Sequence, residues 1–503
     1  MDSFLNIIES VKLTLQGSSN FLSVQPYELL LLSLLLALLL SVSLTTVFRR
    51  SFFRLAGSTQ LPLPPGTYGW PLIGETMRLK KSSKKPEEFV QQRMERYNKS
   101  IFKTSLLGER MAVFCGPAGN KVLFSGENRL VVSWWPRSVQ SIFPLSIITG
   151  HSPRKLLASF LRLEYLRRHV GTMDAVARSH MEAQWAGRRQ LKAAHHVKSY
   201  TFALACRLFA SIDDPDHVLR LQGELEVLVS GVLQIPVKLP GTRYYKAIGA
   251  AEAIRRELRP VIRRRKMDLT EKMVSPVQDL LSYLLVTGDE DGRLMTEEEV
   301  IDNILLLLFA GHDTTSCVIT LVMKNLAEMP HIYNEVLREQ REIAISKKDG
   351  ELLNWDDIQK MKYSWNVVNE TLRLAPPVSG AFREAISDLT FAGFAIPKGW
   401  KLFWSSYTTH TNPDYFPMPE KFDPSRFEGD GLTPYTFVPF GGGPRMCPGK
   451  EFARLEILVF LHNVVKRFRW EAVFPGEKVE IEDGMPHPVQ GLPILIQVQP
   501  NHF

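Results

Sequence analysis

The chain has 503 residues, of which 45% are hydrophobic and 23% charged, so its composition is that of a globular protein and excludes disordered and fibrous classes. Four cysteines in a chain of this length exclude a disulfide scaffold. The net charge of +8 suits an anionic membrane surface, but no basic stripe with interleaved aromatic residues indicates nucleic-acid binding.

The N-terminal region contains a stretch of 20 uncharged residues, 29–48, which is followed by Arg49 and Arg50. A helix of this length crosses a hydrocarbon core of ~30 Å, and the arginines after it place the following chain in the cytosol. The alternatives are a cleaved signal peptide, which would have a basic start and a shorter apolar run, and a buried core helix. We therefore expect a short lumenal segment at 1–28, a single transmembrane anchor at 29–48 and a basic, proline-rich hinge at 49–76.

The body of the chain, 77–503, shows mainly helical patterns and no long linker. We therefore expect one large, mainly α domain with small β-sheets, against a length-based prior of about three domains. Short strands are predicted at 100–107, 110–115, 389–396 and 492–498.

The most informative helix is predicted to begin at Thr296. The Thr296 hydroxyl and the Glu299 carboxylate form a capping box, in which each satisfies a backbone N–H of the first turn. The apolar residues that follow continue to a point before Pro330. A helix so long and so apolar must be buried through the middle of the domain.

The centre of this helix reads Ala-Gly-His-Asp-Thr-Thr over 310–315, and these residues include poor helix formers where packing should be best. One interpretation is a kink around a buried, satisfied aspartate. The other is a site in which the small Ala310 and Gly311 admit a flat ligand, while Asp313 and Thr314 supply a proton donor and a hydroxyl. The residues of this segment alone do not decide between the two.

A glycine-rich stretch, Phe440-Gly441-Gly442-Gly443-Pro444-Arg445-Met446-Cys447-Pro448-Gly449, precedes a helical run at 451–465. Cys447 lies just before that helix, whose N–H groups would stabilise a thiolate. The stretch lacks a phosphate-loop pattern, a protease would need a partnered histidine, and zinc would need several ligands. A single thiolate with Arg445 beside it suits axial ligation of a haem, whose propionates need a cation. The other cysteines are interpreted as small buried apolar residues, Cys115, Cys206 and Cys317.

These two stretches resemble the haem-binding signature and the oxygen-activating helix of the cytochrome P450 family, the haem-thiolate monooxygenases. Two more motifs, Glu370-Thr371-Leu372-Arg373 and Asp423-Pro424-Ser425-Arg426-Phe427, resemble the family's buried Glu/Arg pair and the arginine that completes it. Together the motifs cover the body of the chain in the family's order. The resemblance implies the cytochrome P450 fold, a haem b cofactor and electrons from a membrane-bound, flavin-containing NADPH-cytochrome reductase.

A finer resemblance is to plant triterpenoid-oxidising members of the family, the β-amyrin 28-oxidases among them. It is carried by the segments 71–76, 382–385, 396–401 and 435–439. It implies oxidation of the C-28 methyl of a pentacyclic triterpene to a carboxylic acid, by a cytosolic domain on the endoplasmic reticulum membrane. The alternatives are a single ring hydroxylation, for example at C-16, a haem-thiolate isomerase or dehydratase, and a haem sensor without turnover.

The resemblance also implies a role for each motif residue. Cys447 would be the axial ligand of the haem iron, and Thr314 and Asp313 would relay protons. Structural ion pairing would involve Glu370, Arg373 and Arg426. The residues that would contact the haem or its propionates are Arg445, Arg383, Phe440, Gly441, Gly449, Ala310 and Gly311. The sequence departs from the family at 151–155, which lacks the common Trp-xxx-Arg before the haem. A basic run at 263–266 is interpreted either as a surface for an acidic partner or membrane, or as a solvated helix face.

Overall fold

The computed structural model describes residues 31–41, 61–70, 74–81, 86–149, 154–289, 291–429 and 431–499. The chain divides into two compact units, Met1–Gln60 and Leu61–Phe503. In the first unit the described residues form one apolar helix, Leu31–Ser41, which lies inside the predicted anchor 29–48. The rest of that anchor, the segment 1–28 and the hinge residues 49–60 and 71–73 lie outside the described residues.

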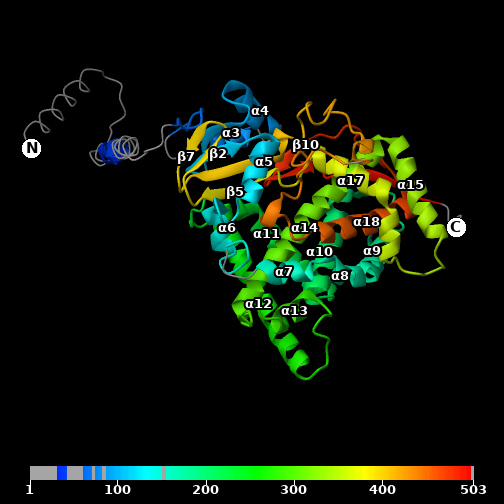
Figure 1. Cartoon of the computed structure of the whole chain (residues 1–503). Helices are drawn as coiled ribbons and strands as arrows, with labels where there is room; N and C mark the ends of the chain where they lie inside the picture. Colours follow the sequence, from blue (N-terminus) through cyan, green and yellow to red (C-terminus); the bar gives the residue numbers. More distant parts are fainter. Residues whose placement is uncertain are drawn as a thin grey trace, which may run out of the picture. The chain divides into compact units, whose positions relative to one another are not determined.

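The second unit is mainly helical (Figure 1). Its helices are α3 (Thr76–Lys81), α4 (Pro86–Arg96), α5 (Gly116–Ser125), α6 (Arg137–Ile142), α7 (Arg154–Phe160), α8 (Leu163–Leu166), α9 (Val170–Gln184), α10 (Ala193–Ala210), α11 (Pro215–Val232), α12 (Arg243–Thr270), α13 (Leu280–Val286), α14 (Glu297–Glu328), α15 (Pro330–Ile345), α16 (Trp355–Lys360), α17 (Lys362–Leu374) and α18 (Lys450–Arg467). Short 3-10 turns are found at Arg167–His169, Ser406–Thr408, Pro424–Phe427 and Gly443–Arg445.

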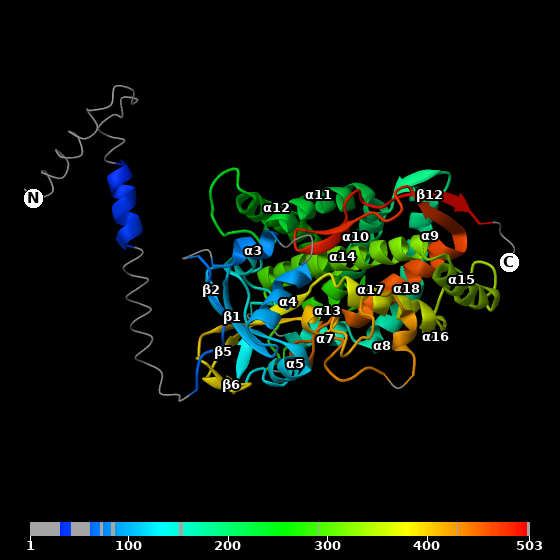
Figure 2. The same cartoon turned by 90° about the horizontal axis from the view of Figure 1, so that it is seen from above.

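The largest sheet has five strands in the order β1-β2-β8-β5-β3. These strands are β1 (Ile101–Leu106), β2 (Glu109–Phe114), β8 (Lys401–Ser405), β5 (Gly380–Ala385) and β3 (Val131–Ser133). Strands β2 and β8 run parallel, and the other pairs are antiparallel. Figures 1 and 2 place this sheet at one side of the unit, with α14 among the helices in the middle.

Three smaller sheets complete the β structure of the described residues. One joins β4 (Gln190–Lys192), β12 (Pro493–Val498) and β9 (Phe468–Ala472), and two hairpins pair β10 (Val479–Glu482) with β11 (Met485–Pro488) and β6 (Leu389–Phe391) with β7 (Phe394–Ile396). The expectation of one large, mainly α domain with small sheets is therefore confirmed.

The predicted strand over 389–396 is wrong in one respect, because the structure has two strands there. Phe391 pairs with Phe394, so only Ala392 and Gly393 form the turn between β6 and β7. Both turn residues have positive φ, +51° and +81°, which is the conformation of a two-residue hairpin turn that follows the twist of the strands.

Helix α14 begins and ends where the sequence predicts. The backbone N–H of Glu299 donates to the Thr296 hydroxyl at 3.3 Å, and the Glu299 carboxylate accepts from the Thr296 N–H at 2.8 Å. The helix has 32 residues and continues without a break through 310–315. It is apolar enough to cross a membrane, but 78% of its apolar window is buried, so it is the central core helix of the unit.

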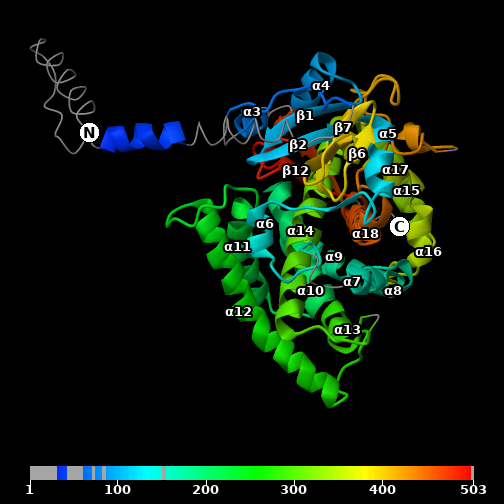
Figure 3. The ribbon, with the colours of Figure 1, turned by 60° about the vertical axis from the view of Figure 1, so that its left-hand side comes forward.

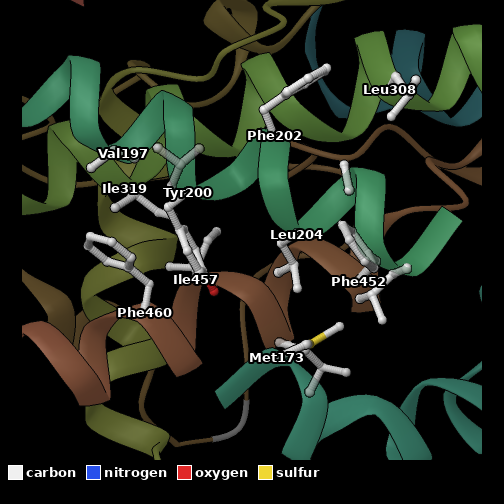
Figure 4. Packing of buried hydrophobic residues seen from close by; sticks show 14 of the residues in the cluster. Met173, Val197, Tyr200, Phe202, Leu204, Leu308, Ile319, Phe452, Ile457 and Phe460 are labelled. Carbon is white, nitrogen blue, oxygen red and sulfur yellow. The ribbon is translucent and has the colours of Figure 1, made fainter. Parts of the chain in front are cut away.

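The core around α14 is built from α9, α10 and α18. Figure 4 shows Tyr200 and Leu204 of α10 close to Phe452 and Ile457 of α18, with Met173 of α9 beside them. These side chains belong to one cluster of buried apolar residues. This packing fixes the start of α18, and with it the cysteine loop that precedes α18, against the middle of α14.

Candidate active site

The loop 440–449 brings Cys447 to the start of α18 through tight backbone packing. The Cys447 N–H donates to the Phe440 carbonyl at 2.9 Å and closes the loop. Gly443 has a φ of +65°, and a Cβ at this position would lie 2.1 Å from the carbonyl oxygen of Phe124, so only glycine fits. Cys447 is exposed, so its sulfur is not packed into the core.

The other three cysteines behave as predicted. Cys115, Cys206 and Cys317 are buried, and burial raises the pKa of each thiol. Such thiols stay protonated and inert. Cys447 is therefore the cysteine of this chain whose position suits a thiolate ligand.

The middle of α14 has one side that does not face the core. Ala310 is exposed and Thr314 is half-buried, although most of the helix is buried. The Thr314 hydroxyl donates to the Ala310 carbonyl at 2.7 Å. Gly311 points elsewhere, because a Cβ built on it would lie 3.4 Å from the ring of Phe209 and 3.9 Å from that of Phe452. Of the two small residues, Ala310 is therefore the one that borders open space.

Asp313 is buried and paired with a lysine that the sequence analysis missed. Lys198 of α10 places its Nζ 2.9 Å from Asp313 Oδ1, and 29% of its side chain is exposed against 2% for Asp313. Burial opposes the charged form of Lys198, but attraction and a hydrogen bond to Asp313 outweigh burial and raise its pKa. The aspartate in the middle of α14 is thus satisfied by an ion pair that reaches toward solvent.

A second missed residue, Glu127, joins two of the predicted arginines. Glu127 Oε2 lies 2.9 Å from Nε of Arg383, and Glu127 Oε1 lies 2.9 Å from Nε of Arg445. The Glu127 side chain is only 1% exposed, and its Oε1 also accepts from the Ser133 N–H. One buried carboxylate therefore fixes both arginines through their Nε atoms. This pairing holds the Nε side of each guanidinium group and thereby fixes the orientation of both groups.

The predicted cluster of Glu370, Arg373 and Arg426 is present and buried. Glu370 and Arg373 are both 0% exposed and form a bidentate pair at 2.7 and 2.8 Å, while Arg426 Nε lies 3.3 Å from Glu370 Oε1. Arg373 also donates to the carbonyl of His410 at 2.8 Å, and His410 Nε2 accepts from the Val438 N–H at 2.9 Å. His410, a third residue missed from sequence, thus links the cluster to the chain that enters the cysteine loop.

The basic run on α12 is paired within the molecule. Arg263 and Lys266 lie 3.1 and 3.5 Å from Glu297, and Arg264 lies 3.6 Å from Asp268. Arg265 is buried and paired with Asp279. These contacts favour the interpretation of a charged helix face over a surface reserved for an acidic partner.

The residues present fit a haem. A sulfur outside the core, two arginines fixed by one carboxylate, and an exposed alanine on a buried helix are what a flat anionic cofactor between α14 and the cysteine loop requires. Phe452, in the first turn of α18, lies close to Gly311, since a Cβ built on Gly311 would be 3.9 Å from the Phe452 ring. Within the described residues no cluster of three or more His, Cys, Asp or Glu side chains could hold a metal ion.

The family model described as "Cytochrome P450" matches residues 64–495. The chain belongs to the cytochrome P450 family. It is therefore a haem-thiolate monooxygenase that binds haem b, takes electrons from a reductase partner and acts on hydrophobic substrates. It is 53% identical to a β-amyrin 28-monooxygenase of Vitis vinifera, over 93% of this chain and 99% of the relative.

Two further comparisons bear on the fold and on the position of oxidation. A β-amyrin 6-β-monooxygenase of Solanum lycopersicum is 50% identical to this chain over 91% of its length and 97% of the relative. The cyanobacterial structure CYP120A1, solved with retinoic acid bound, is 32% identical, with a TM-score of 0.78. The similarity covers 88% of this chain and 100% of that structure, so the cytochrome P450 fold extends over the whole body.

Replacing Glu127 by glutamine should release haem faster. Glutamine keeps the size of the side chain but removes the charge that holds Arg383 and Arg445. Because hydrogen bonds to charged groups are the strong ones, we expect haem transfer to apomyoglobin to speed up about tenfold. If Arg383 and Arg445 contact the haem propionates, the iron reduction potential should also rise, since the negative charge of Glu127 behind them is lost.

The matched control for this prediction is Glu384→Gln. Glu384 is the neighbour of Arg383 on β5, but it is 35% exposed and pairs with Lys401 at 2.6 Å. Equal haem transfer rates and equal potentials in the two variants would contradict the role given to Glu127.

Proposed function

We propose that this monooxygenase oxidises the C-28 methyl of a β-amyrin-type triterpene to the alcohol, the aldehyde and then the carboxylic acid. The observation that carries the proposal is the 53% identity to the β-amyrin 28-monooxygenase of Vitis vinifera over nearly the full length of both chains. Each oxidation consumes one dioxygen and one NADPH, and one oxygen atom leaves as water.

We assign the cofactor contacts as follows. Cys447 provides the thiolate that ligates the iron, and Arg445 and Arg383, fixed by Glu127, bind the propionates through charge-assisted hydrogen bonds. Phe440, Gly441 and Gly449 form the loop beside the cofactor, and Ala310, with Gly311 next to it, leaves room on the side of α14. When bound, the haem supplies the activation of dioxygen needed to attack an unreactive C–H bond.

We assign proton delivery to Thr314 and Asp313. The Thr314 hydroxyl lies on the open side of α14, where it donates to the Ala310 carbonyl and could turn to hold a proton at the face of α14 that a haem would occupy. Asp313 is the neighbouring acid, and its partner Lys198 connects it to solvent. Glu370, Arg373 and Arg426 hold the fold around the cysteine loop and do not touch the reacting atoms.

A second candidate function is hydroxylation of a ring carbon. It is favoured by the 50% identity to the β-amyrin 6-β-monooxygenase of Solanum lycopersicum, which covers almost the same share of the chain. Relatives of nearly equal similarity thus act at different carbons of one skeleton. The position of oxidation depends on how the substrate lies over the haem.

Product analysis in yeast that makes β-amyrin and a plant NADPH-cytochrome P450 reductase separates the two functions. We expect oleanolic acid together with its alcohol and aldehyde precursors, identified by mass spectrometry. A single ring alcohol would instead establish the second candidate. An intact carbon-monoxide difference spectrum without any β-amyrin product would overturn the proposed substrate and leave the monooxygenase assignment in place.

We also propose that the enzyme is a single-pass protein of the endoplasmic reticulum membrane. The uncharged stretch 29–48 and the arginines after it support an anchor with a lumenal segment 1–28, a hinge 49–76 and a cytosolic catalytic domain 77–503. The described helix Leu31–Ser41 lies within that stretch. The partner in this setting is the membrane-bound NADPH-cytochrome P450 reductase.

A further inference from the structure

A polar cluster apart from the active-site residues joins three elements, which are α12, α14 and the segment 142–149 at the end of α6. Asp302 of α14 lies at its centre. Arg255 of α12 donates its Nε to Asp302 Oδ1 at 2.8 Å, and the Leu145 N–H donates to Oδ2 at 2.8 Å. Arg255 also donates its Nη2 to the Ile142 carbonyl at 2.5 Å. Arg255 and Asp302 therefore bind each other, and each binds the segment as well.

The next residue of α14 adds another tie to the same segment. The Ile147 N–H donates to Asn303 Oδ1 at 3.1 Å, and Asn303 Nδ2 donates to the Glu299 carbonyl at 2.7 Å. Asp302 and Asn303 are 2% and 0% exposed, and the Arg255 side chain is 12% exposed. A buried carboxylate is held strongly to its cation, since separating them leaves an uncompensated charge. The cluster thus favours the arrangement in which α12 and the segment both contact α14.

The segment 142–149 borders the open side of α14. The ring of Phe143 packs on that of Phe309 with 5.4 Å between centroids, and Phe309 directly precedes the exposed Ala310. Helix α6 contacts both α11 and α12, and α12 contacts α14 (Figure 3). A bulky molecule that reaches the space at Ala310 from this side must therefore separate the segment or α12 from α14.

We infer that Arg255 and Asp302 form a latch that holds this side of the active site closed and sets how fast bulky ligands reach and leave it. The inference goes beyond the proposed function, because the latch acts on any ligand too large to pass while it is closed. Because this latch closes again behind a bound ligand, its opening multiplies the association and the dissociation rate by the same factor. Weakening the latch should therefore change both rates together and leave the affinity almost unchanged.

The test uses the haem-loaded full chain in lipid nanodiscs and two probes, clotrimazole as a bulky imidazole and carbon monoxide as a small ligand. Asp302→Asn keeps the side-chain size and an acceptor for Leu145, and Arg255→Gln removes the cation. The matched control is Arg259→Gln, one turn further along α12, which breaks a more exposed pair with Glu298 at 3.1 Å.

We expect each latch variant to raise the clotrimazole association and dissociation rates about tenfold, the scale of a hydrogen bond to a charged group. Carbon monoxide should bind at the wild-type rate in every variant, and Arg259→Gln should bind clotrimazole like the wild type. The rate increase in the double variant should be smaller than the product of the two single increases, because both changes break the same Arg255–Asp302 pair.

Three results would overturn the inference. They are wild-type clotrimazole rates in both latch variants, equal acceleration by Arg259→Gln, and equal acceleration of carbon monoxide binding, which would mean general loosening of the fold. If Asp302→Asn does not retain haem, Arg255→Gln and Arg255→Lys still decide, since lysine keeps the charge next to Asp302 and should restore slow binding. None of these readouts uses a triterpene, so failure of the proposed substrate does not affect them.

Discussion

Replacing Glu370 by glutamine is expected to lower the free energy of unfolding by about 3–5 kcal/mol. Glutamine keeps the volume of the side chain, so the loss comes from charge and not from a cavity. Arg373 is 0% exposed and Arg426 is 11% exposed, and Glu370 is the carboxylate that both of them contact. Domains are stable by only about 5–15 kcal/mol, so this single change removes a large share of the total.

The same substitution should also reduce the share of protein that retains haem. Arg373 donates to the His410 carbonyl, and His410 Nε2 accepts from the N–H of Val438, which leads into the cysteine loop. Since Nε2 is an acceptor, the ring proton lies on Nδ1, 3.3 Å from the Arg373 carbonyl. Burial lowers the pKa of His410 to about 3, so the ring stays neutral and keeps these roles. If Arg373 loses its position, His410 and then Val438 lose theirs, and the loop that contains Cys447 becomes less ordered.

The control for this prediction is Glu335→Gln. Glu335 and Arg338 form a pair with the same i,i+3 spacing and an N–O distance of 2.6 Å, but on the exposed face of α15. A solvent-exposed pair contributes little, so the urea midpoint and the haem content should match those of the wild type. Equal midpoints for the two variants would show that burial of the Glu370 pair carries no special weight in this fold.

Local signals in the sequence predict α14 and four strand positions, but they do not predict seven other strands, which are β3, β4, β5, β8, β9, β10 and β11. The capping box gives the start of α14 to the residue, and Pro330 gives its end, because both act within one turn of the helix. The single strand predicted over 389–396 is two strands in the structure, since the Ala-Gly turn in its middle resembles a short apolar alternation. The motifs likewise identify Cys447 and Glu370 by their immediate neighbours.

The partners of the motif residues could not be predicted in the same way. Lys198, Glu127 and His410 come from distant parts of the chain, and their roles depend on which helices and strands pack together. The sequence does contain a weak indication of the role of Lys198. This lysine lies among apolar residues that are buried in α10, and a lysine in such a position needs a charged partner. No comparable signal marks Glu127, whose importance arises only when β5 and the cysteine loop meet.

Removing the acid or the hydroxyl from the middle of α14 should lower product formation about 10²- to 10⁴-fold, the usual contribution of a positioned proton donor. The variants are Asp313→Asn and Thr314→Val, which keep the side-chain shapes. NADPH oxidation should fall less than product formation in Thr314→Val, because electrons still arrive and leave as hydrogen peroxide. The carbon-monoxide difference spectrum should not change, since neither residue holds the cofactor in place.

The matched control for Thr314 lies on the same helix. Thr320 donates its hydroxyl to the Ser316 carbonyl at 2.8 Å, as Thr314 does to Ala310 at 2.7 Å, but Thr320 is buried in the core. Thr320→Val therefore removes the same kind of bond without touching the open side of α14, and product per NADPH should stay at the wild-type value. Equal losses in the two variants would mean that the hydroxyl of Thr314 acts only through the helix.

Lys198→Met tests whether the ion pair, and not Asp313 alone, supplies the proton path. Lys198 is charged at neutral pH because Asp313 outweighs its burial, and it is the exposed end of the pair. If protons pass from solvent along this pair, the solvent isotope effect on product formation should increase in Lys198→Met and in Asp313→Asn alike. A wild-type isotope effect in Lys198→Met, with a reduced rate in Asp313→Asn, would place the proton path on another side of Asp313 and leave Lys198 with a purely structural role.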